Sequence, residues 1–471
     1  MMTEVDDMGS PYQEPSIINT ISFGTSGFWS MFAYSVFGAY FFFFYEVAIG
    51  LNAIYIGTAM IIFTLWDAVN DPLIGYLTDR ITKLTKRFGK RFPWIIVGII
   101  PANFLFALMF MPPMGNAATN PWPIFIWIVV TTCAFDTLAT LCFINVESLF
   151  PDKFRSGKAR RKARGWGTPL SMIAIPASAI IPPLIITFED PASYVPMAWL
   201  CVGILAVVSI LFLPGMWENK ELIDRYFVVK WKPETFIAAL KSTLKQKSFR
   251  YWIIIFFGFV VVTNSLTASI PYAVFFVMGG DETDAILLFA SFLNGALISV
   301  PVWIYINKRL KNNKKSAIIG GITLVCGLLI VFFFDPMDKN LIFASMIMIF
   351  ILGFTMGNLW ALTSVYFADV LDERVAIVRS PVRGTTVGVQ SFFNRLSRGA
   401  AIAVITIVHI LTGFVSGSGS QTELAKLGIR LHMTVIPAIV LFIATLIFWK
   451  RYPLTPERIL EVKQQIQKIG F

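Results

Sequence analysis

Charged residues are scarce in this chain of 471 residues, since Asp, Glu, Lys and Arg make up only 14% of it. A soluble globular protein usually carries about 25%. Hydrophobic residues reach 56% and mean hydropathy is +0.70, so too little charge is present to cover a water-exposed surface. This composition excludes a disordered chain, a collagen, a coiled coil and a small disulfide-rich module. The class that remains is a polytopic membrane protein.

Cysteine and histidine are also rare, with four and two residues. Each cysteine lies inside an apolar run and none forms a CxxC pair, which argues against structural disulfides and a thiolate zinc site. His409 and His432 are isolated in the sequence, and we interpret His409 as a hydrogen-bonded packing residue rather than a proton relay. The first fifteen residues are polar and acidic without Lys or Arg, so no cleavable signal peptide is expected.

Twelve apolar runs approach or exceed the 20 or so residues that a spanning helix needs. They cover residues 20–47, 52–77, 93–112, 122–149, 166–187, 195–216, 251–278, 285–306, 316–335, 340–368, 385–413 and 431–450. The pattern predicts an all-α polytopic membrane protein with twelve transmembrane helices in two six-helix bundles. We expect an N-terminal bundle over 1–216, a cytoplasmic central loop over 217–250, a C-terminal bundle over 251–450 and a cytoplasmic tail over 451–471. Six plus six helices are typical of transporters built from two related halves.

The cations are distributed very unevenly between the two sets of loops. The loops after the even-numbered runs, together with the tail, hold 34 of the 39 Lys and Arg residues, and the opposite loops hold three. Cytoplasmic loops of membrane proteins are enriched in Lys and Arg. We therefore expect both termini to be cytoplasmic, with the plasma membrane as the default location. The same asymmetry explains the net charge of +11 without a nucleic-acid partner.

A few ionisable residues fall inside the second apolar run, where a charge needs a partner or a water-filled cavity. In the segment WDAVNDP, residues Asp67, Asn70 and Asp71 are spaced i, i+3 and i+4, which places them on one helix face. Two neighbouring carboxylates repel, and in low dielectric they hold a proton or a cation between them. Oxygen ligands suit Na⁺ rather than a thiophilic metal. The alternative is a pair neutralised by a basic residue from another helix.

Other intramembrane charges are weaker candidates. Asp136 lies near the middle of the fourth run and is a candidate for substrate binding. Glu147 lies near its cytoplasmic end, where a salt bridge to the basic loop is as good an interpretation as a substrate role. Arg395 and Arg398 lie in the eleventh run, and either a cavity role or a structural role fits Arg395. We expect Glu46 to be solvated at the outer interface.

The segment WDAVNDPLIGYLTDR (66–80), followed by GKRFPW (89–94), resembles the second span and following loop of the glycoside–pentoside–hexuronide cation symporters. These melibiose permease-like proteins belong to the major facilitator superfamily. The resemblance extends to ADVLDE (368–373) and VQSFFNRL (389–396). It implies a symporter, not an enzyme, that moves a small organic solute with Na⁺ or H⁺ by alternating access. It also implies no cofactor, no metal beyond the Na⁺ site, and a monomer.

The resemblance carries the cation site over completely. Asp67, Asn70 and Asp71 match the family's positions in the second span. Aligning NVESLFPD (145–152) on the family's fourth span places Thr140 at its cation-binding threonine. The family's lysine of the eleventh span falls on Arg395, so a cation is kept there.

The sugar site does not carry over. Met31 and Phe143 fall where the family places its sugar-binding aspartates, so two groups that would hold sugar hydroxyls are apolar here. Asp136 and Glu147 are the carboxylates that could substitute, and Trp360 is either a stacking surface for a sugar ring or a packing residue. A sugar or glycoside remains the expected substrate. The alternative is a lysophospholipid or another amphiphile, because the lysolipid symporters of the same branch resemble this pattern.

The loop after the second span resembles a cytoplasmic gate of the superfamily, carried by Gly75, Asp79, Arg80 and Arg91. Asp79 is expected to pair with a basic residue such as Arg91 or to cap a helix. The alternative is simple anchoring of the loop at the cytoplasmic surface.

Two other function classes remain open. The spacing of Asp67, Asp71 and Asp79 superficially suggests an intramembrane prenyltransferase-type enzyme, which would hold Mg²⁺ and a diphosphate. Its second acidic motif would have to be 281–284, which lies on the opposite side of the predicted membrane, so this alternative is remote. A non-transporting receptor or scaffold on the same fold would be expected to have lost the cation carboxylates.

Overall fold

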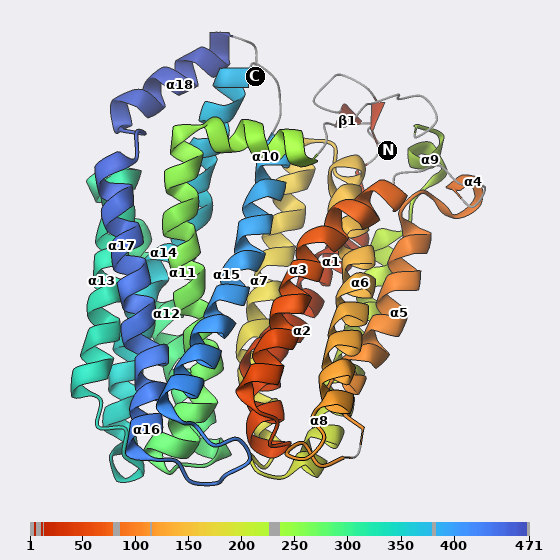
Figure 1. Cartoon of the computed structure of the whole chain (residues 1–471). Coiled ribbons are helices and arrows are strands. Elements are labelled where there is room, and N and C mark those ends of the chain that lie inside the picture. Colours follow the sequence, from red (N-terminus) through yellow and green to blue (C-terminus); the bar gives the residue numbers. More distant parts are fainter. Residues whose placement is uncertain are drawn as a thin grey trace. The chain divides into compact units, whose positions relative to one another are not determined.

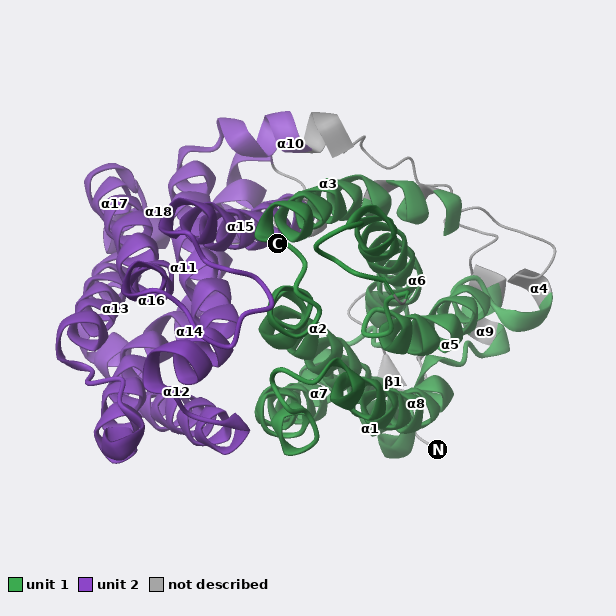
Figure 2. Ribbon diagram, turned by 60° about the horizontal axis from the view of Figure 1, so that its bottom comes forward, with its two compact units in different colours: residues 1–232 green, residues 233–471 purple. Residues whose placement is uncertain are grey.

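The computed structural model describes residues 4–5, 11–12, 14–78, 85–113, 115–225, 236–378 and 383–468. The chain forms two compact units, residues 1–232 and 233–471, coloured separately in Figure 2. The boundary falls inside the polar segment 217–250.

Unit 1 is built almost entirely of helices (Figure 1). A two-residue strand pair, β1 (Glu4–Val5) with β2 (Pro11–Tyr12), precedes them. The main helices are α1 (Ile17–Gly24), α2 (Ser26–Phe43), α3 (Ala53–Thr78), α5 (Phe92–Leu108), α6 (Trp122–Lys153), α7 (Gly157–Ile180) and α8 (Tyr194–Met216). Short elements complete the unit: η1 (Phe44–Ala48), α4 (Thr85–Phe88), η2 (Pro182–Leu184), η3 (Pro191–Ser193) and α9 (Lys220–Arg225).

Unit 2 repeats this pattern of long helices. They are α11 (Lys247–Tyr272), α12 (Glu282–Leu310), α13 (Asn313–Phe334), α14 (Ile342–Val378), α15 (Arg383–Thr412) and α17 (Ile436–Arg451). The shorter elements are α10 (Phe236–Lys245), η4 (Ala273–Met278), η5 (Lys339–Leu341), α16 (Glu423–Arg430), η6 (Leu431–Val435) and α18 (Pro456–Lys468).

The predicted all-α membrane fold with twelve spans is confirmed. Within the described ranges, eleven stretches are long and apolar enough to cross a membrane, and the shorter apolar helix Phe92–Leu108 occupies the place of the predicted third span. Several helices run past the predicted limits, because hydropathy marks only the part in hydrocarbon. α7 begins at Gly157 and not at 166, and α14 continues to Val378 and not to 368.

The first long helix of each unit ends in the same unusual way. α2 passes into the π-helical η1, and α11 passes into the π-helical η4. Each is followed by a glycine with positive φ, Gly50 at 76° and Gly279 at 65°. The next amide bonds back six residues in both cases, from Leu51 to Tyr45 and from Gly280 to Val274, each at 2.9 Å. This repeated ending agrees with two related halves.

Unit 2 depends on a very close approach of α12 and α14. A Cβ atom on Gly353 would lie 2.0 Å from the main-chain oxygen of Phe292, and one on Gly295 would lie 2.1 Å from that of Phe350. Small residues at such positions let transmembrane helices pack by direct backbone contact.

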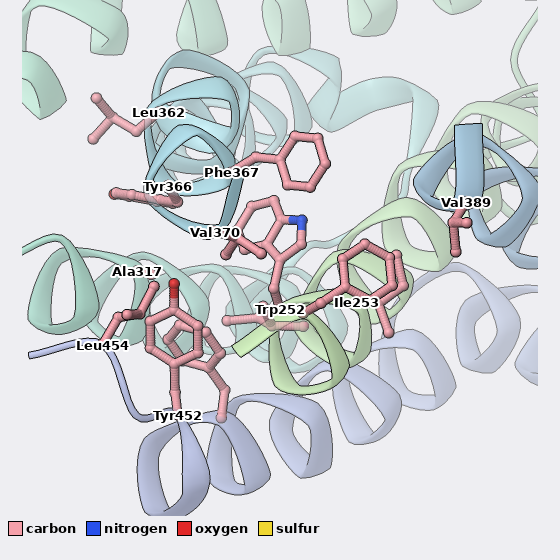
Figure 3. Packing of buried hydrophobic residues seen from close by; sticks show 13 residues of the cluster. Trp252, Ile253, Ala317, Leu362, Tyr366, Phe367, Val370, Val389, Tyr452 and Leu454 are labelled. Atoms are coloured by element: carbon pink, nitrogen blue, oxygen red, sulfur yellow. The ribbon is translucent and has the colours of Figure 1, made fainter. Parts of the chain in front are cut away.

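An aromatic cluster joins α11, α14 and α17 within unit 2 (Figure 3). The Trp252 ring stacks on Phe367 with centroids 5.9 Å apart and meets Tyr366 edge-on at 6.3 Å. Phe448 stacks on Tyr452 at 4.2 Å on the α17 side. These rings are almost fully buried, and their contacts fix the positions of the three helices relative to one another.

The start of α5 is capped by a carboxylate just after the end of α8, a helix that packs against α5. The Glu218 carboxylate, 2% exposed, accepts hydrogen bonds from the main-chain amides of Lys90 (3.2 Å), Arg91 (2.8 Å) and Phe92 (2.9 Å). Helix N-termini leave amide groups without intrahelical partners, and a carboxylate there satisfies them and their positive dipole. Gly89, with φ at 92°, lets the chain turn against this carboxylate.

We expect Glu218→Ala to lower the free energy of unfolding by about 2 kcal/mol, because buried amides lose a charged acceptor. The measurement is the thermal unfolding midpoint of the purified protein in detergent. Glu461→Ala is the control, since this carboxylate is 59% exposed in a surface pair with Arg458. Equal midpoints for the two variants would contradict the cap.

Candidate functional site

The predicted cation-binding residues lie on α3 and α6, two helices that pack against each other. On α3, Asp67 is 6% and Asn70 4% exposed, and Asp71 is half-buried. On α6, Asp136 is 1% and Thr140 6% exposed. The Nδ2 group of Asn70 donates a hydrogen bond of 3.0 Å to Oδ2 of Asp136. The structure therefore brings Asp136 into the polar layer that contains the predicted cation residues.

Helix periodicity explains why these side chains converge. Residues 67, 70 and 71 share one face of α3, and residues 136 and 140 lie one turn apart on α6. A second bond fixes the register of the two helices, because Nε1 of Trp66 donates to Oγ1 of Thr137 at 3.0 Å. Asp136 is thereby held opposite Asn70.

The chemistry of this layer is that of hard oxygen donors. It contains carboxylates, an amide and a hydroxyl, which suit a monovalent cation or a proton. In the part of the chain that the structure describes, no group of three or more His, Cys, Asp or Glu side chains is placed to hold a metal ion. The bond to Asp136 uses the amide hydrogen of Asn70, so the Oδ1 atom of that amide is directed away from Asp136.

The two positions expected to have lost sugar-binding carboxylates have apolar side chains in unit 1, one packed on aromatic rings and one exposed. Phe143 packs on the indole of Trp29 with ring centroids 5.2 Å apart, and Trp29 also stacks on Phe135 at 6.0 Å. The Trp29 Nε1 group is occupied by Oδ1 of Asn103 at 2.8 Å. Met31 on α2 has a side chain that is 48% exposed.

Glu147 interacts with a different helix from the one that Asp136 contacts. Its side chain is 67% exposed and pairs with Arg164 of α7 at 3.3 Å. Of the two interpretations open from the sequence, this contact agrees with the salt bridge to the basic loop.

The remaining substrate candidates belong to unit 2. Arg395 on α15 is half-buried. Trp360 on α14 is also half-buried and meets Phe292 of α12 edge-on, with centroids 6.1 Å apart. This contact gives Trp360 a packing role inside unit 2.

Half of the predicted gate can be seen. Arg91 is 7% exposed, and its Nη1 group donates to Oδ1 of Asn145 at 3.2 Å. Gly75 lies on α3 with open space where a Cβ would project. Asp79 and Arg80 fall outside the described residues, so the expected pairing of Asp79 with Arg91 stays a prediction.

One expectation about a single residue is wrong. Glu46, expected to be solvated, is fully buried in η1. His409 is buried and hydrogen-bonded, as expected, and its partner is His432, with the two Nε2 atoms 3.0 Å apart. Residue spacing carries no signal for the burial of Glu46 or for the partner of His409, because both depend on which helices pack together. The π-helical turns that carry Glu46 and His432 are equally invisible to hydropathy.

Comparison with known proteins identifies the family of the chain. The family model described as "MFS/sugar transport protein" matches residues 22–456. The chain is 22% identical to the mouse sodium-dependent lysophosphatidylcholine symporter 1, covering 86% of this chain and 79% of that protein. It is 24% identical to the isoprimeverose transporter of Lactiplantibacillus pentosus, covering 94% and 91%. A solved structure of a point mutant of the nucleoside transporter NupG has the same fold, with a TM-score of 0.58 at 12% identity over 93% of this chain and 99% of that one.

Replacing Asn145 and replacing Glu147, two residues apart on α6, should change the free energy of unfolding by very different amounts. Asn145→Ala removes a fully buried acceptor of the Arg91 guanidinium and should lower the free energy of unfolding by about 2 kcal/mol. Glu147→Gln breaks only an exposed ion pair and should cost less than about 1 kcal/mol. Thermal unfolding midpoints in detergent compare them, and a larger loss for Glu147→Gln would refute the assignment.

Proposed function

Because the chain belongs to the MFS/sugar transport family, whose members are transporters and not enzymes, we propose that it is a cation-coupled secondary active symporter. It moves a small organic solute with Na⁺ or H⁺ by alternating access. The observation that carries this proposal is the buried polar layer between α3 and α6, in which Asn70 and Asp136 are hydrogen-bonded beside Asp67 and Asp71. Burying a carboxylate in a membrane costs free energy, and the carboxylates found there usually mark the pathway of a substrate or an ion.

The carboxylates Asp67 and Asp71 are the proposed cation ligands, together with Asn70 and Thr140. A bound Na⁺ or H⁺ reduces the net charge of the carboxylate pair from −2 to −1, so the occluded transporter carries less uncompensated charge through the low-dielectric interior. This charge balance couples the movement of the cation to that of the solute.

Asp136 has a positioning role in this proposal. By accepting the Nδ2 hydrogen of Asn70, it leaves the amide oxygen, and not the amide nitrogen, to face a cation. Its negative charge also adds to the attraction. Asp136, Thr140 and Phe143 follow one another at i, i+4 and i+7 on one face of α6, so Asp136 and Phe143 are about 10 Å apart along the helix. The cation layer is therefore close to a position expected to meet substrate.

A sugar or glycoside is the first candidate solute. The family description and the isoprimeverose transporter support it, since that relative matches over 94% of this chain. Arg395, Trp360, Met31 and Phe143 stay candidate substrate residues.

A lysophospholipid or similar amphiphile is the second candidate, and one observation favours it. Phe143 packs on Trp29, and Met31 presents an exposed apolar side chain, at the two positions where a sugar site would need carboxylates. An apolar wall suits an acyl chain better than it suits sugar hydroxyls. The lysophosphatidylcholine symporter of mouse matches 86% of this chain.

We also propose that both termini are cytoplasmic and that the protein lies in the plasma membrane. The concentration of 34 of 39 cations in one set of loops supports this orientation.

Transport into proteoliposomes tests the proposed function. With an imposed inward Na⁺ or H⁺ gradient, we expect uptake of a labelled β-glycoside or of labelled lysophosphatidylcholine. Asp67→Asn and Asp71→Asn should each abolish the gradient-driven part, because each removes a ligand charge. Glu147→Gln is the matched control, an exposed carboxylate whose loss should leave uptake unchanged. Coupled uptake that survives in both aspartate variants would disprove the cation site.

The role of Asp136 has a separate signature. Asp136→Asn allows the Asn70 amide to turn, so we expect the Na⁺ concentration for half-maximal uptake to rise about tenfold, which corresponds to about 1.4 kcal/mol. The maximal rate at saturating Na⁺ should change much less. Asp136→Glu, which keeps the acceptor, should restore part of the affinity. A fall in maximal rate at unchanged Na⁺ affinity would instead indicate contact with the solute.

A further inference from the structure

A buried hydrogen-bond chain ties three elements together inside unit 2. His409 near the end of α15 is 1% exposed, and His432 in η6 is fully buried. Their Nε2 atoms are 3.0 Å apart, and Nδ1 of His432 is 2.8 Å from Oγ of Ser269 on α11. Oγ of Ser269 in turn donates to the main-chain oxygen of Ser265 at 2.5 Å. The loops 279–281 and 413–422, both poor in cations, lie at this end of the unit.

The direction of this chain follows from counting hydrogens. The single hydroxyl hydrogen of Ser269 goes to Ser265, so Oγ of Ser269 accepts from Nδ1–H of His432. A neutral His432 then has a lone pair on Nε2, which accepts from Nε2–H of His409. Every bond in the chain is satisfied with both rings neutral. Only one hydrogen fits between the two Nε2 atoms.

Aromatic side chains enclose the two rings. Phe414 stacks on His409 with ring centroids 4.3 Å apart, and Tyr272 forms T-shaped pairs with His409 and His432 at 5.1 and 6.3 Å. His409 is 1% exposed and His432 fully buried, so water is excluded from both imidazoles. A first added proton would bury a charge there, and a second would also set two N–H groups against each other.

The charged groups on neighbouring elements are engaged elsewhere or lie at a distance. Arg430, two residues before His432, donates to the main-chain oxygens of Phe332 and Asp335. Glu423 and Lys426 on α16 pair with each other at 2.9 Å. Arg398 on α15 precedes His409 by eleven residues, about three turns. Among the side chains that the structure describes, the other charged ones on the helices packed against η6 are Lys247 and Arg250 on α11, Lys314 and Lys315 on α13, Arg395 on α15, and Lys450 and Arg451 on α17.

Carboxylates near this end have partners of their own. Oδ1 of Asp335 accepts from Oγ of Ser345 at 2.7 Å. Asp281, at the start of α12, accepts from Lys339 at 2.9 Å, and this bond holds the pKa of the Asp281 carboxyl below its usual value. Asp284 completes the cap of the same helix, because its Oδ2 atom accepts a hydrogen bond of 3.0 Å from the main-chain amide of Asp281.

We propose that His409, His432 and Ser269 form a proton-sensitive latch, which ties the end of α15 and η6 to α11 and opens when it takes up a proton. In the closed latch both imidazoles are neutral and dry. When α15 or η6 moves away, the rings meet water, where an imidazole takes up a proton near pH 6.5. Protons therefore bind the open form in preference and shift the equilibrium toward it. The latch does not depend on the cation layer of unit 1.

Hydrogen–deuterium exchange of the full-length protein in detergent, followed by mass spectrometry, tests the latch. After correction for the intrinsic pH dependence of exchange, peptides over 405–435 should exchange up to about tenfold faster for each pH unit below about 6.5, if opening binds one proton. Peptides over 95–107 of α5, a helix of unit 1, serve as the internal control and should stay constant. Equal corrected exchange of 405–435 at pH 5.5 and 7.5 in the wild type would overturn the proposal.

Two variants distinguish the effect of protonation on exchange from the effect of lost packing. The double variant His409→Gln and His432→Gln keeps polar groups but no titratable ring, and it should lose the pH dependence. His432→Phe breaks the chain and should exchange fast at both pH values. A full pH response in the double variant would also overturn the proposal. If the variants fail to fold, the wild-type comparison still decides.

Discussion

The hydrocarbon core of a membrane contains no water to hydrogen-bond a polar group, so the protein must supply the partner itself. This constraint shapes both the scaffold and the buried polar sites of this transporter. It forces the chain into helices, which satisfy their own backbone. It also favours a partner for each buried polar side chain inside its own bundle. Asp136 accepts from the amide of Asn70, and Ser269 accepts from the ring of His432.

The same constraint fixes the orientation of the donors and acceptors in buried polar side chains. An amide or an imidazole presents a donor on one side and an acceptor on the other, so a single fixed neighbour decides which atom faces the next group. Asp136 sets the orientation of Asn70 in this way, and Ser269 sets the tautomer of His432. In the proposals made above, each unit thus contains a buried polar cluster at which a proton or a cation binds. The two clusters use different chemistry, carboxylates in unit 1 and imidazoles in unit 2.

Features that depend on composition and local period could be predicted from the sequence. The spans follow from apolar length, and the shared face of Asp67, Asn70 and Asp71 follows from a spacing of three and four residues. Features that depend on packing between distant helices could not. The partner of Asp136 is 66 residues away, and the two histidines are 23 residues apart on elements separated by a loop and a π-helical turn. Glu46 was misjudged for a related reason, because hydropathy near the end of a run does not reveal whether a π-helical turn directs a side chain inward.

In the proposed function, the arrangement of α6 allows one scaffold to serve different solutes. Asp136 and Thr140 belong to the proposed cation layer, while Phe143, one turn further along the same face, packs on Trp29 of α2. Substitution at Phe143 would then change the chemistry offered to a solute without altering the residues proposed to bind the cation. Relatives with printed substrates as different as lysophosphatidylcholine and isoprimeverose match nearly the whole chain at 22% and 24% identity. Such low identity over such long matches is what a conserved scaffold with an exchangeable solute site would produce.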